Sequence, residues 1–103
     1  MWAQIIKMRV KPGTEQDLPG LFQHLNEFEQ PGSGLLRSMA MQDQNDPGQA
    51  YVLVVFESEE KARAREQDPR RREGMASLRA TMEQMFTGAP EYIDLTVLAD
   101  LSQ

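Results

Sequence analysis

A run of six large apolar residues, Tyr51 to Phe56, limits what this chain can fold into more than any other feature of its sequence. Successive side chains of a β-strand point to opposite faces of the sheet, so this run makes both faces of its strand apolar. The residues of the two faces are Val52, Val54 and Phe56 on one, and Tyr51, Leu53 and Val55 on the other. A chain of 103 residues can supply helices for one face and has little left for a second layer.

The elements around this run follow a simple order. We expect strands at residues 2–11, 35–43, 51–56 and 91–99, a helix that begins near Asp17, a short helix over 59–66 and a longer one over 70–86. This strand, helix, strand, strand, helix, strand order is typical of an α+β, ferredoxin-like fold, with a four-stranded antiparallel sheet and its helices on one face. No linker interrupts the pattern, so residues 1–103 are predicted to form a single domain.

Both main helices carry an apolar stripe that can cover the sheet. The stripes consist of Leu18, Leu21, Phe22, Leu25 and Phe28 in the first helix, and of Met75, Leu78, Met82, Met85 and Phe86 in the last. Ser58 is expected to cap the short helix, and Asp68-Pro69 to separate it from the long one.

The second face of the sheet would remain uncovered in a single chain. We expect it to expose an apolar patch of about 500 Å², which is at the upper limit for monomers. At about 25 cal/mol per Å², covering such a patch contributes on the order of 10 kcal/mol before the cost of association. We therefore predict a homodimer formed by sheet-to-sheet packing. A lone domain with an open face and a soluble partner protein are the alternatives.

Composition excludes several classes of function. A net charge of −5 argues against nucleic acid, and residues 61–72, which hold six of the eleven basic residues, are interspersed with acids and are interpreted as a solvated face. No apolar segment is long enough to span a membrane and no signal peptide is evident, so a cytoplasmic location is the expectation. With no cysteine and one histidine, His24, no metal site is expected.

One long stretch, "GLLRSMAMQDQNDPGQAYVLVVFESEEKARAREQDP" with the preceding "VKPGTEQDL", resembles the antibiotic biosynthesis monooxygenase-like family. The matching features are the Pro-Gly after the first strand, the "DP" hairpin, and the third strand that runs into "FESEEKARA" and an Asp-Pro break. The resemblance implies a dimeric α/β barrel with a pocket between the sheet and the helices of each subunit. It also implies one of several activities: cofactor-free oxygenation of aromatic polyketides, haem degradation, isomerisation of small metabolites, or none.

The active branches of this family carry site residues that can be compared with the chain. The haem-degrading branch pairs an asparagine on strand one with a tryptophan at the end of strand three and a histidine on the last main helix. The positions that match are Ile6 and Phe56, and residues 70–86 contain no histidine, so the resemblance argues against haem degradation. The polyketide oxygenases place an asparagine and a tryptophan on strand three, where this chain has Val52 and Phe56.

Candidate site residues can also be chosen by chemistry. His24 alone has an ordinary pKa near 7, so it is the candidate catalytic base, although its place at the edge of an apolar stripe also suits plain packing. The candidate substrate-binding residues, which could equally be ordinary core, are Phe22, Phe28, Phe56, Met75, Met82 and Phe86. Arg37 or Arg79 could neutralise an anionic substrate, Tyr51 or Tyr92 could donate a hydrogen bond, and Asp94 could act as a base if it points inward.

These observations predict a cytoplasmic, homodimeric, cofactor-independent monooxygenase-like protein that acts on a small apolar or aromatic metabolite. The expected cofactor and metal content is none. A non-catalytic small-ligand-binding or structural module of the same fold is the alternative, and a small-metabolite isomerase is a third possibility.

Overall fold

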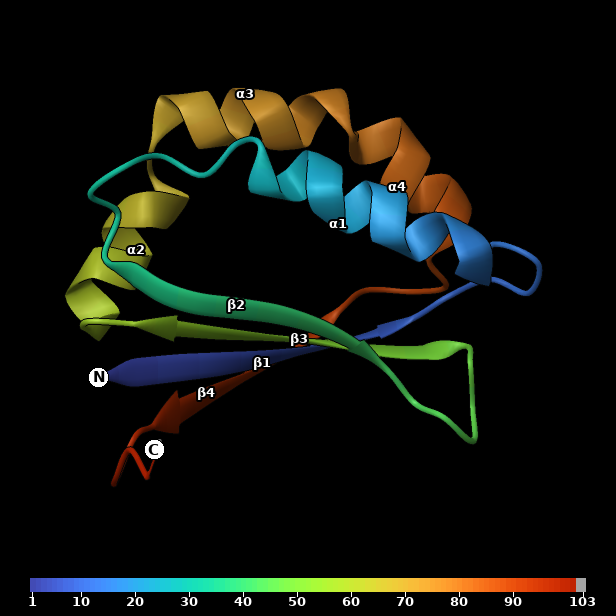
Figure 1. The fold of residues 1–103 in the computed structure, drawn as a ribbon. Helices are drawn as coiled ribbons and strands as arrows, with labels where there is room; N and C mark the ends of the chain where they lie inside the picture. The colour runs from blue at the N-terminus through green and yellow to red at the C-terminus, as the bar shows by residue number, and fades with distance from the viewer. Residues whose placement is uncertain (102–103) are drawn as a thin grey trace.

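The computed structural model describes residues 1–101, which form an antiparallel sheet beneath a layer of helices (Figure 1). The strands are β1 (Trp2–Arg9), β2 (Leu35–Gln42), β3 (Gln49–Phe56) and β4 (Glu91–Thr96). They are arranged in the order β2-β3-β1-β4, and every neighbouring pair is antiparallel. This arrangement confirms the ferredoxin-like α+β fold expected from the sequence.

The helical layer consists of a short 3₁₀ turn, η1 (Glu15–Asp17), and of α1 (Leu18–Asn26), α2 (Glu59–Glu66), α3 (Pro69–Ser77) and α4 (Arg79–Met85). α1 begins at Leu18 because Pro19 fits only in a first helical turn. Ser58 caps α2 by accepting a hydrogen bond from the Lys61 amide, and Asp68 caps α3 in the same way through the Arg70 amide. None of the helices in the described residues is long and apolar enough to cross a membrane.

The single helix predicted over 70–86 is wrong, because the chain forms two helices that meet at Leu78. The Ser77 hydroxyl donates a 2.6 Å hydrogen bond to the Gly74 carbonyl, and the Leu78 amide donates to the Met75 carbonyl three residues back. Both bonds tighten the last turn of α3 and replace the regular ladder of an α-helix. The break lets α3 and α4 follow the curve of the sheet at different angles (Figure 1).

The register of β1 against β3 settles which side chains face the helices. Ile6 pairs with Val52 and Gln4 with Val54, and these four side chains all line the space beneath the helical layer. Phe56 is 2% exposed. The even-numbered residues of β3 therefore face the helices, a choice between the two faces that the sequence left open.

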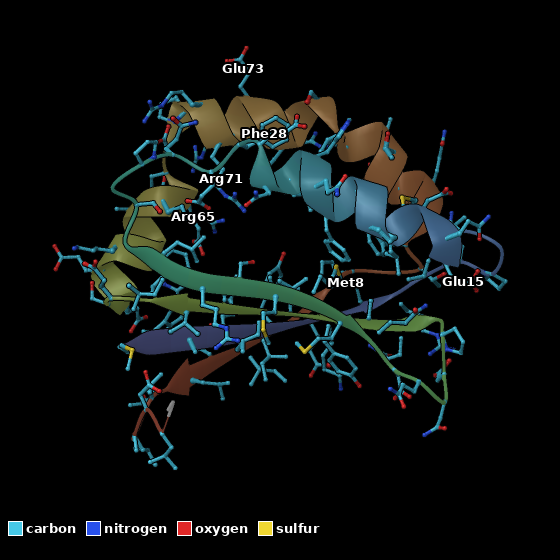
Figure 2. The ribbon with its side chains drawn as sticks, in the orientation of Figure 1. Met8, Glu15, Phe28, Arg65, Arg71 and Glu73 are labelled. Atoms are coloured by element: carbon cyan, nitrogen blue, oxygen red, sulfur yellow. The ribbon has the colours of Figure 1, made fainter. Side chains whose placement is uncertain are left out.

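The opposite side of the sheet, called the outer face here, carries no helix (Figure 1). In Figure 2, its side chains project below the strands, where no other element covers them. The apolar residues of the outer face are Ile5, Met39, Met41, Tyr51, Leu53, Val55, Ile93 and Leu95. Three of them are more than a third exposed, with Met41 at 41% and both β4 residues at 36%. The uncovered apolar face inferred from the sequence is present in the structure.

Candidate ligand cavity

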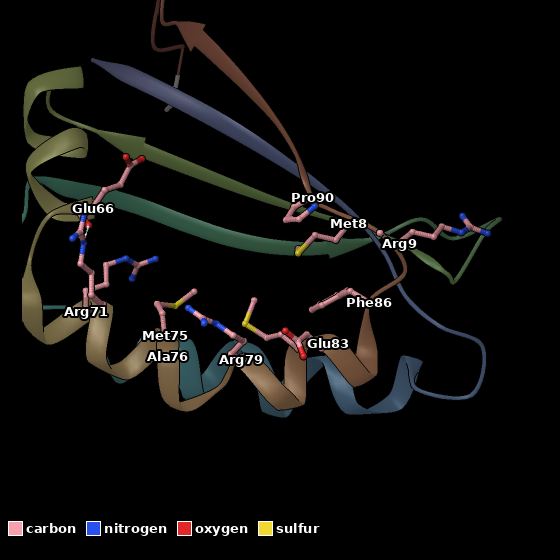
Figure 3. Close-up of a pocket in the computed structure, with 13 residues that line it drawn as sticks. Met8, Arg9, Glu66, Arg71, Met75, Ala76, Arg79, Glu83, Phe86 and Pro90 are labelled. Carbon is pink, nitrogen blue, oxygen red and sulfur yellow. Dashed lines mark hydrogen bonds between the residues drawn. The ribbon is translucent and has the colours of Figure 1, made fainter.

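A cavity of about 820 Å³ lies between the sheet and the helices. The sheet side is formed by Gln4, Ile6, Ser38, Ala40, Val52 and Val54, and the helix side by Phe22, Leu25, Met75 and Met82. A second hollow of about 800 Å³ adjoins it beneath α3 and α4, sharing Met8, Glu66, Arg71, Met75, Met82 and Pro90 with it. In Figure 3, the Met75 and Phe86 side chains of the helical side face Met8 and Pro90 of the sheet side. A volume of this size suits a small organic molecule.

The cavity exists because the core is divided into two clusters at opposite ends of the sheet. One cluster joins Val10, Leu18, Leu21, Ala50 and Met85 at the end where β1 leads into α1. The other joins Trp2, Val54, Phe56 and Ala62 at the opposite end. Between them the floor includes two small side chains of β2, Ser38 and Ala40, which are too short to reach the helices. Interiors are normally packed without such gaps, so this space is a feature that needs an explanation.

The α2 end of the cavity is polar, and the most buried ion pair of the described residues lies there. Arg65 donates to both carboxylate oxygens of Glu29, at 2.8 and 2.6 Å to Oε1 and 3.2 Å to Oε2, and both side chains are less than 20% exposed. Burial raises the pKa of Glu29, but the hydrogen bond and positive charge of Arg65 outweigh it and leave that pKa below its ordinary value. The Arg65 guanidinium also lies over the Phe56 ring, 5.2 Å from its centre. Arg65 is thus fixed and neutralised.

A second polar group connects the sheet to α2. Gln4 donates a 2.8 Å hydrogen bond to Asp94 Oδ1, and Arg63 donates at 2.9 Å to the other carboxylate oxygen. The bond from Gln4 is the largest effect on the pKa of Asp94, and together with the bond and charge of Arg63 it outweighs desolvation and keeps that pKa below its ordinary value. Arg63 also covers the Trp2 ring at 5.1 Å from its centre. Asp94 therefore lines the cavity as a firmly held carboxylate.

Arg71 differs from these two arginines. It is half-buried on α3, lines both hollows (Figure 3) and lies near Arg65 (Figure 2). Among residues 1–101, no side chain forms a hydrogen bond or an ion pair with its guanidinium. Burial, followed by the like charge of Arg65, lowers the pKa of Arg71, while Glu29 and Glu66 act weakly in the opposite direction. The cavity therefore contains one desolvated and unpaired cation.

A comparison with protein families connects this architecture to known proteins. The model described as "Antibiotic biosynthesis monooxygenase" matches residues 1–77 of the chain.

The chain belongs to the antibiotic biosynthesis monooxygenase family. Members of this family include cofactor-independent monooxygenases and haem-degrading proteins. A search of curated proteins found no significant match.

Solved structures share the fold with this family member. SnoaB, a cofactor-independent oxygenase from Streptomyces nogalater solved as a mutant, is 17% identical with a TM-score of 0.76, covering 99% of this chain and 97% of SnoaB. A MhuD mutant with two manganese protoporphyrin IX molecules per active site is 18% identical with a TM-score of 0.78 over 100% of both chains. A protein from Chloroflexus aurantiacus J-10-fl is 23% identical with a TM-score of 0.72, covering 98% and 96%. At these identities the likeness establishes the fold alone.

The residues of the cavity do not fit a histidine-bound haem of the kind used by the haem-degrading branch of the family. Ile6 and Phe56, which stand at the positions of that branch's asparagine and tryptophan, both line the cavity and are apolar. Neither α3 nor α4 contains a histidine. His24 is exposed on α1 and is not among the lining residues. Within residues 1–101, no group of three or more His, Asp or Glu side chains could hold a metal ion.

The other candidates from the sequence are only partly brought together. Phe22, Phe56, Met75 and Met82 line the central cavity, and Phe86 lines the adjoining hollow. Phe28 lies elsewhere, because its ring packs against Gly74 of α3. Arg79 lines the adjoining hollow. Arg37 of β2 is opposite Val55 of β3, so it lies on the outer face of the sheet.

The sequence interpretation missed Arg65 and Arg71, because it treated residues 61–72 as a solvated face. That description holds for Lys61, Arg63 and Arg70, which form exposed ion pairs with nearby acids. A signal for Arg71 was nevertheless available. Residues 71, 75, 78 and 82 follow the i, i+4, i+7, i+11 spacing of one helical stripe, which places Arg71 on the apolar side that faces the sheet.

Proposed function

We propose that this protein is a cofactor-independent monooxygenase that binds a small apolar or aromatic metabolite in the central cavity. The observation that carries the proposal is the cavity of about 820 Å³ with aromatic and methionine walls, held open between two core clusters in a member of this family. Methionine walls adapt to flat ligands because the side chain is flexible and polarizable.

Oxygenation without a cofactor requires a substrate that supplies the electrons itself. A base removes a proton from an activated methylene group, and the resulting carbanion reduces dioxygen. One oxygen atom becomes the new carbonyl oxygen, and the other leaves as water with both methylene hydrogens. A cavity that excludes water protects the carbanion until oxygen reacts. We propose His24 as the base on the ground of its chemistry alone, because its ring is exposed on α1 and does not line the cavity.

Oxygen uptake with a panel of anthrones and hydroquinones tests this proposal. Consumption that saturates with substrate, and that falls when Ala40→Phe fills the cavity floor, supports it; indifference to the whole panel refutes it. The same assay with His24→Ala tests the base. An unchanged rate would exclude His24, whose ring is exposed on α1.

A second candidate function is a non-catalytic ligand-binding module. It is favoured by Val52 and Phe56, which both line the cavity. The polyketide oxygenases that the sequence resembles carry an asparagine and a tryptophan at these two positions. This module would bind the same aromatic compounds without consuming oxygen, so calorimetry beside the uptake assay separates the two functions. An isomerase, the third reading, would convert its substrate without oxygen uptake.

We also propose that two copies of the chain pair through the outer face. Proteins with this fold are commonly dimeric. The outer face offers the apolar side chains for such an interface, and Lys7 and Glu91, 3.6 Å apart, add a polar pair on the same side. Light scattering that gives a mass near 11.7 kDa at micromolar concentration would refute the dimer. The cytoplasmic location expected from the sequence stays a prediction.

A further inference from the structure

The charge of Arg71 sets a condition on any molecule that occupies the central cavity. An arginine stays protonated under ordinary conditions, so the cavity holds a permanent positive charge. Removing such a charge from water is unfavourable unless a counter-charge or hydrogen-bond acceptors replace the lost hydration. Within residues 1–101 the guanidinium has no acceptor, although acids are close enough to influence it. A ligand with a hydrogen-bond acceptor, bound in this cavity, would supply one.

The neighbouring ion pairs indicate how much charge the ligand carries. Arg65 is already neutralised by Glu29 at 2.6 Å, and Arg63 by Asp94 at 2.9 Å. Glu66 is exposed and reaches Arg63 at 3.4 Å, so it is not hydrogen-bonded to Arg71. Glu66 also lines the cavity, so the three arginines at this end, Arg63, Arg65 and Arg71, face three acids, Glu29, Glu66 and Asp94. Arg71 is the one of these arginines without a hydrogen-bonded acid. A monoanion adds one negative charge beside Arg71, whereas a dianionic phosphate would add two beside the Glu29 carboxylate.

The remaining walls define the rest of the ligand. Met75 lies one helical turn after Arg71 on α3, and Met82 follows on α4, so the apolar wall begins immediately beside the guanidinium. Ile6 and Val52 face them from the sheet. A molecule that extends from Arg71 along this wall meets apolar surface on both sides. The wall next to Arg71 is thus apolar.

We propose that the ligand of this cavity is an aromatic or alicyclic monocarboxylate whose carboxylate pairs with Arg71. The planar guanidinium presents two parallel N–H donors that match the two carboxylate oxygens. The ring system lies between the methionines of α3 and α4 and the apolar side chains of β1 and β3. This inference rests on the proposed function, because it names the class of metabolite that the same cavity accepts.

Calorimetric titration with matched probes tests the inference. The probes are 2-naphthoate, its uncharged amide 2-naphthamide, and 2-naphthyl phosphate, which share one ring system and differ in the head group. The expected result is that 2-naphthoate binds at least tenfold more tightly than either of the others. Arg71→Leu should abolish this preference and leave the affinity for 2-naphthamide within about twofold. Arg71→Gln is the second variant, in case the leucine variant does not fold.

Arg70→Leu is the matched control, since it removes the same charge from the adjacent position of α3. Arg70 pairs with Asp68 and is 68% exposed, so its loss should leave the preference for the carboxylate intact. Equal binding of 2-naphthoate and 2-naphthamide to the wild type would overturn the inference and leave the proposed function standing. A preference that persists in both Arg71 variants, or tighter binding of the phosphate, would also overturn it. Binding of no probe at all would overturn both.

Discussion

Replacing Arg71 by leucine should make the ligand-free protein more stable. Leucine and arginine have similar helix propensities, so the change acts on burial and charge rather than on α3 itself. Half-burying a leucine contributes about 1 kcal/mol, which is half of the value for full burial. Relieving the desolvation of an unpaired cation adds about 1 kcal/mol, at the low end for buried charges because this side chain is only half-buried.

Of two smaller effects, one opposes this gain and the other adds to it. The attraction of Arg71 to Glu29 and Glu66 is lost, which costs about 0.5 kcal/mol for partly exposed charges. Against that, the repulsion between Arg71 and the fixed guanidinium of Arg65 disappears as well. The expected net change in the free energy of unfolding is a gain of about 1 to 2 kcal/mol. For a domain of this size, such a gain raises the melting temperature by about 5 to 10 °C.

Differential scanning calorimetry at pH 7 and one fixed protein concentration measures the shift, because the melting temperature of a dimer depends on concentration. Arg70→Leu provides the reference for loss of one surface charge, and its free energy of unfolding should stay within about 0.5 kcal/mol of the wild type. A melting temperature of Arg71→Leu that falls below that of Arg70→Leu would refute the reasoning. It would mean that the Arg71 guanidinium stabilises the folded, ligand-free chain, so its burial would be no argument for a bound anion.

Three further predictions concern the ion pair, the helix contact and the outer face. Because the pKa of Glu29 lies below its ordinary value of 4.5, its stabilising contribution is complete above that pH and is lost as the pH falls through the lower folded value; acid unfolding of Glu29→Gln should therefore be less steep below about pH 4.5. Gly74→Ala would place a Cβ 2.5 Å from the Phe28 ring and should lower the free energy of unfolding by about 1 to 3 kcal/mol, whereas Gly20→Ala, which meets nothing within 4 Å, should raise it by up to about 1 kcal/mol in urea titrations. Leu53→Glu on the outer face should halve the mass measured by light scattering to 11.7 kDa; a mass unchanged from the wild type would exclude the outer face as the interface.

The sheet was predictable because the alternation of apolar side chains that defines its strands is local and periodic in the sequence. The alternation from Tyr51 to Phe56 divided these side chains into two faces, and the structure shows that Val52, Val54 and Phe56 form the face beneath the helices. Ser58 marked the start of α2, because an N-cap acts on its own helix and needs no tertiary partner. Asp68-Pro69 marked the break before α3, where the structure also shows Asp68 as the N-cap. The break at Leu78 was not predictable, since it depends on a side-chain hydrogen bond within one turn.

The site was less predictable than the sheet because it depends on what is missing from the core. The aromatic and methionine residues were chosen for their size, and that choice cannot separate cavity walls from filled core. Phe28 shows the difficulty, because it belongs to the same stripe as Phe22 and yet packs against Gly74. Arg71 was overlooked because a sequence of alternating charges gives no indication of which partner each arginine finds.

The division of the core into two clusters has a consequence for folding cooperativity. With the cavity empty, the Val10 and Trp2 ends of the molecule share the sheet but have no continuous apolar packing between them. Each end should therefore open to hydrogen exchange at its own free energy, below that of global unfolding. A molecule lodged between them would act as the middle of the core, and the two ends would then exchange their amide protons as one unit. Occupancy of the cavity would thus be visible in backbone amides far from any contact with the ligand.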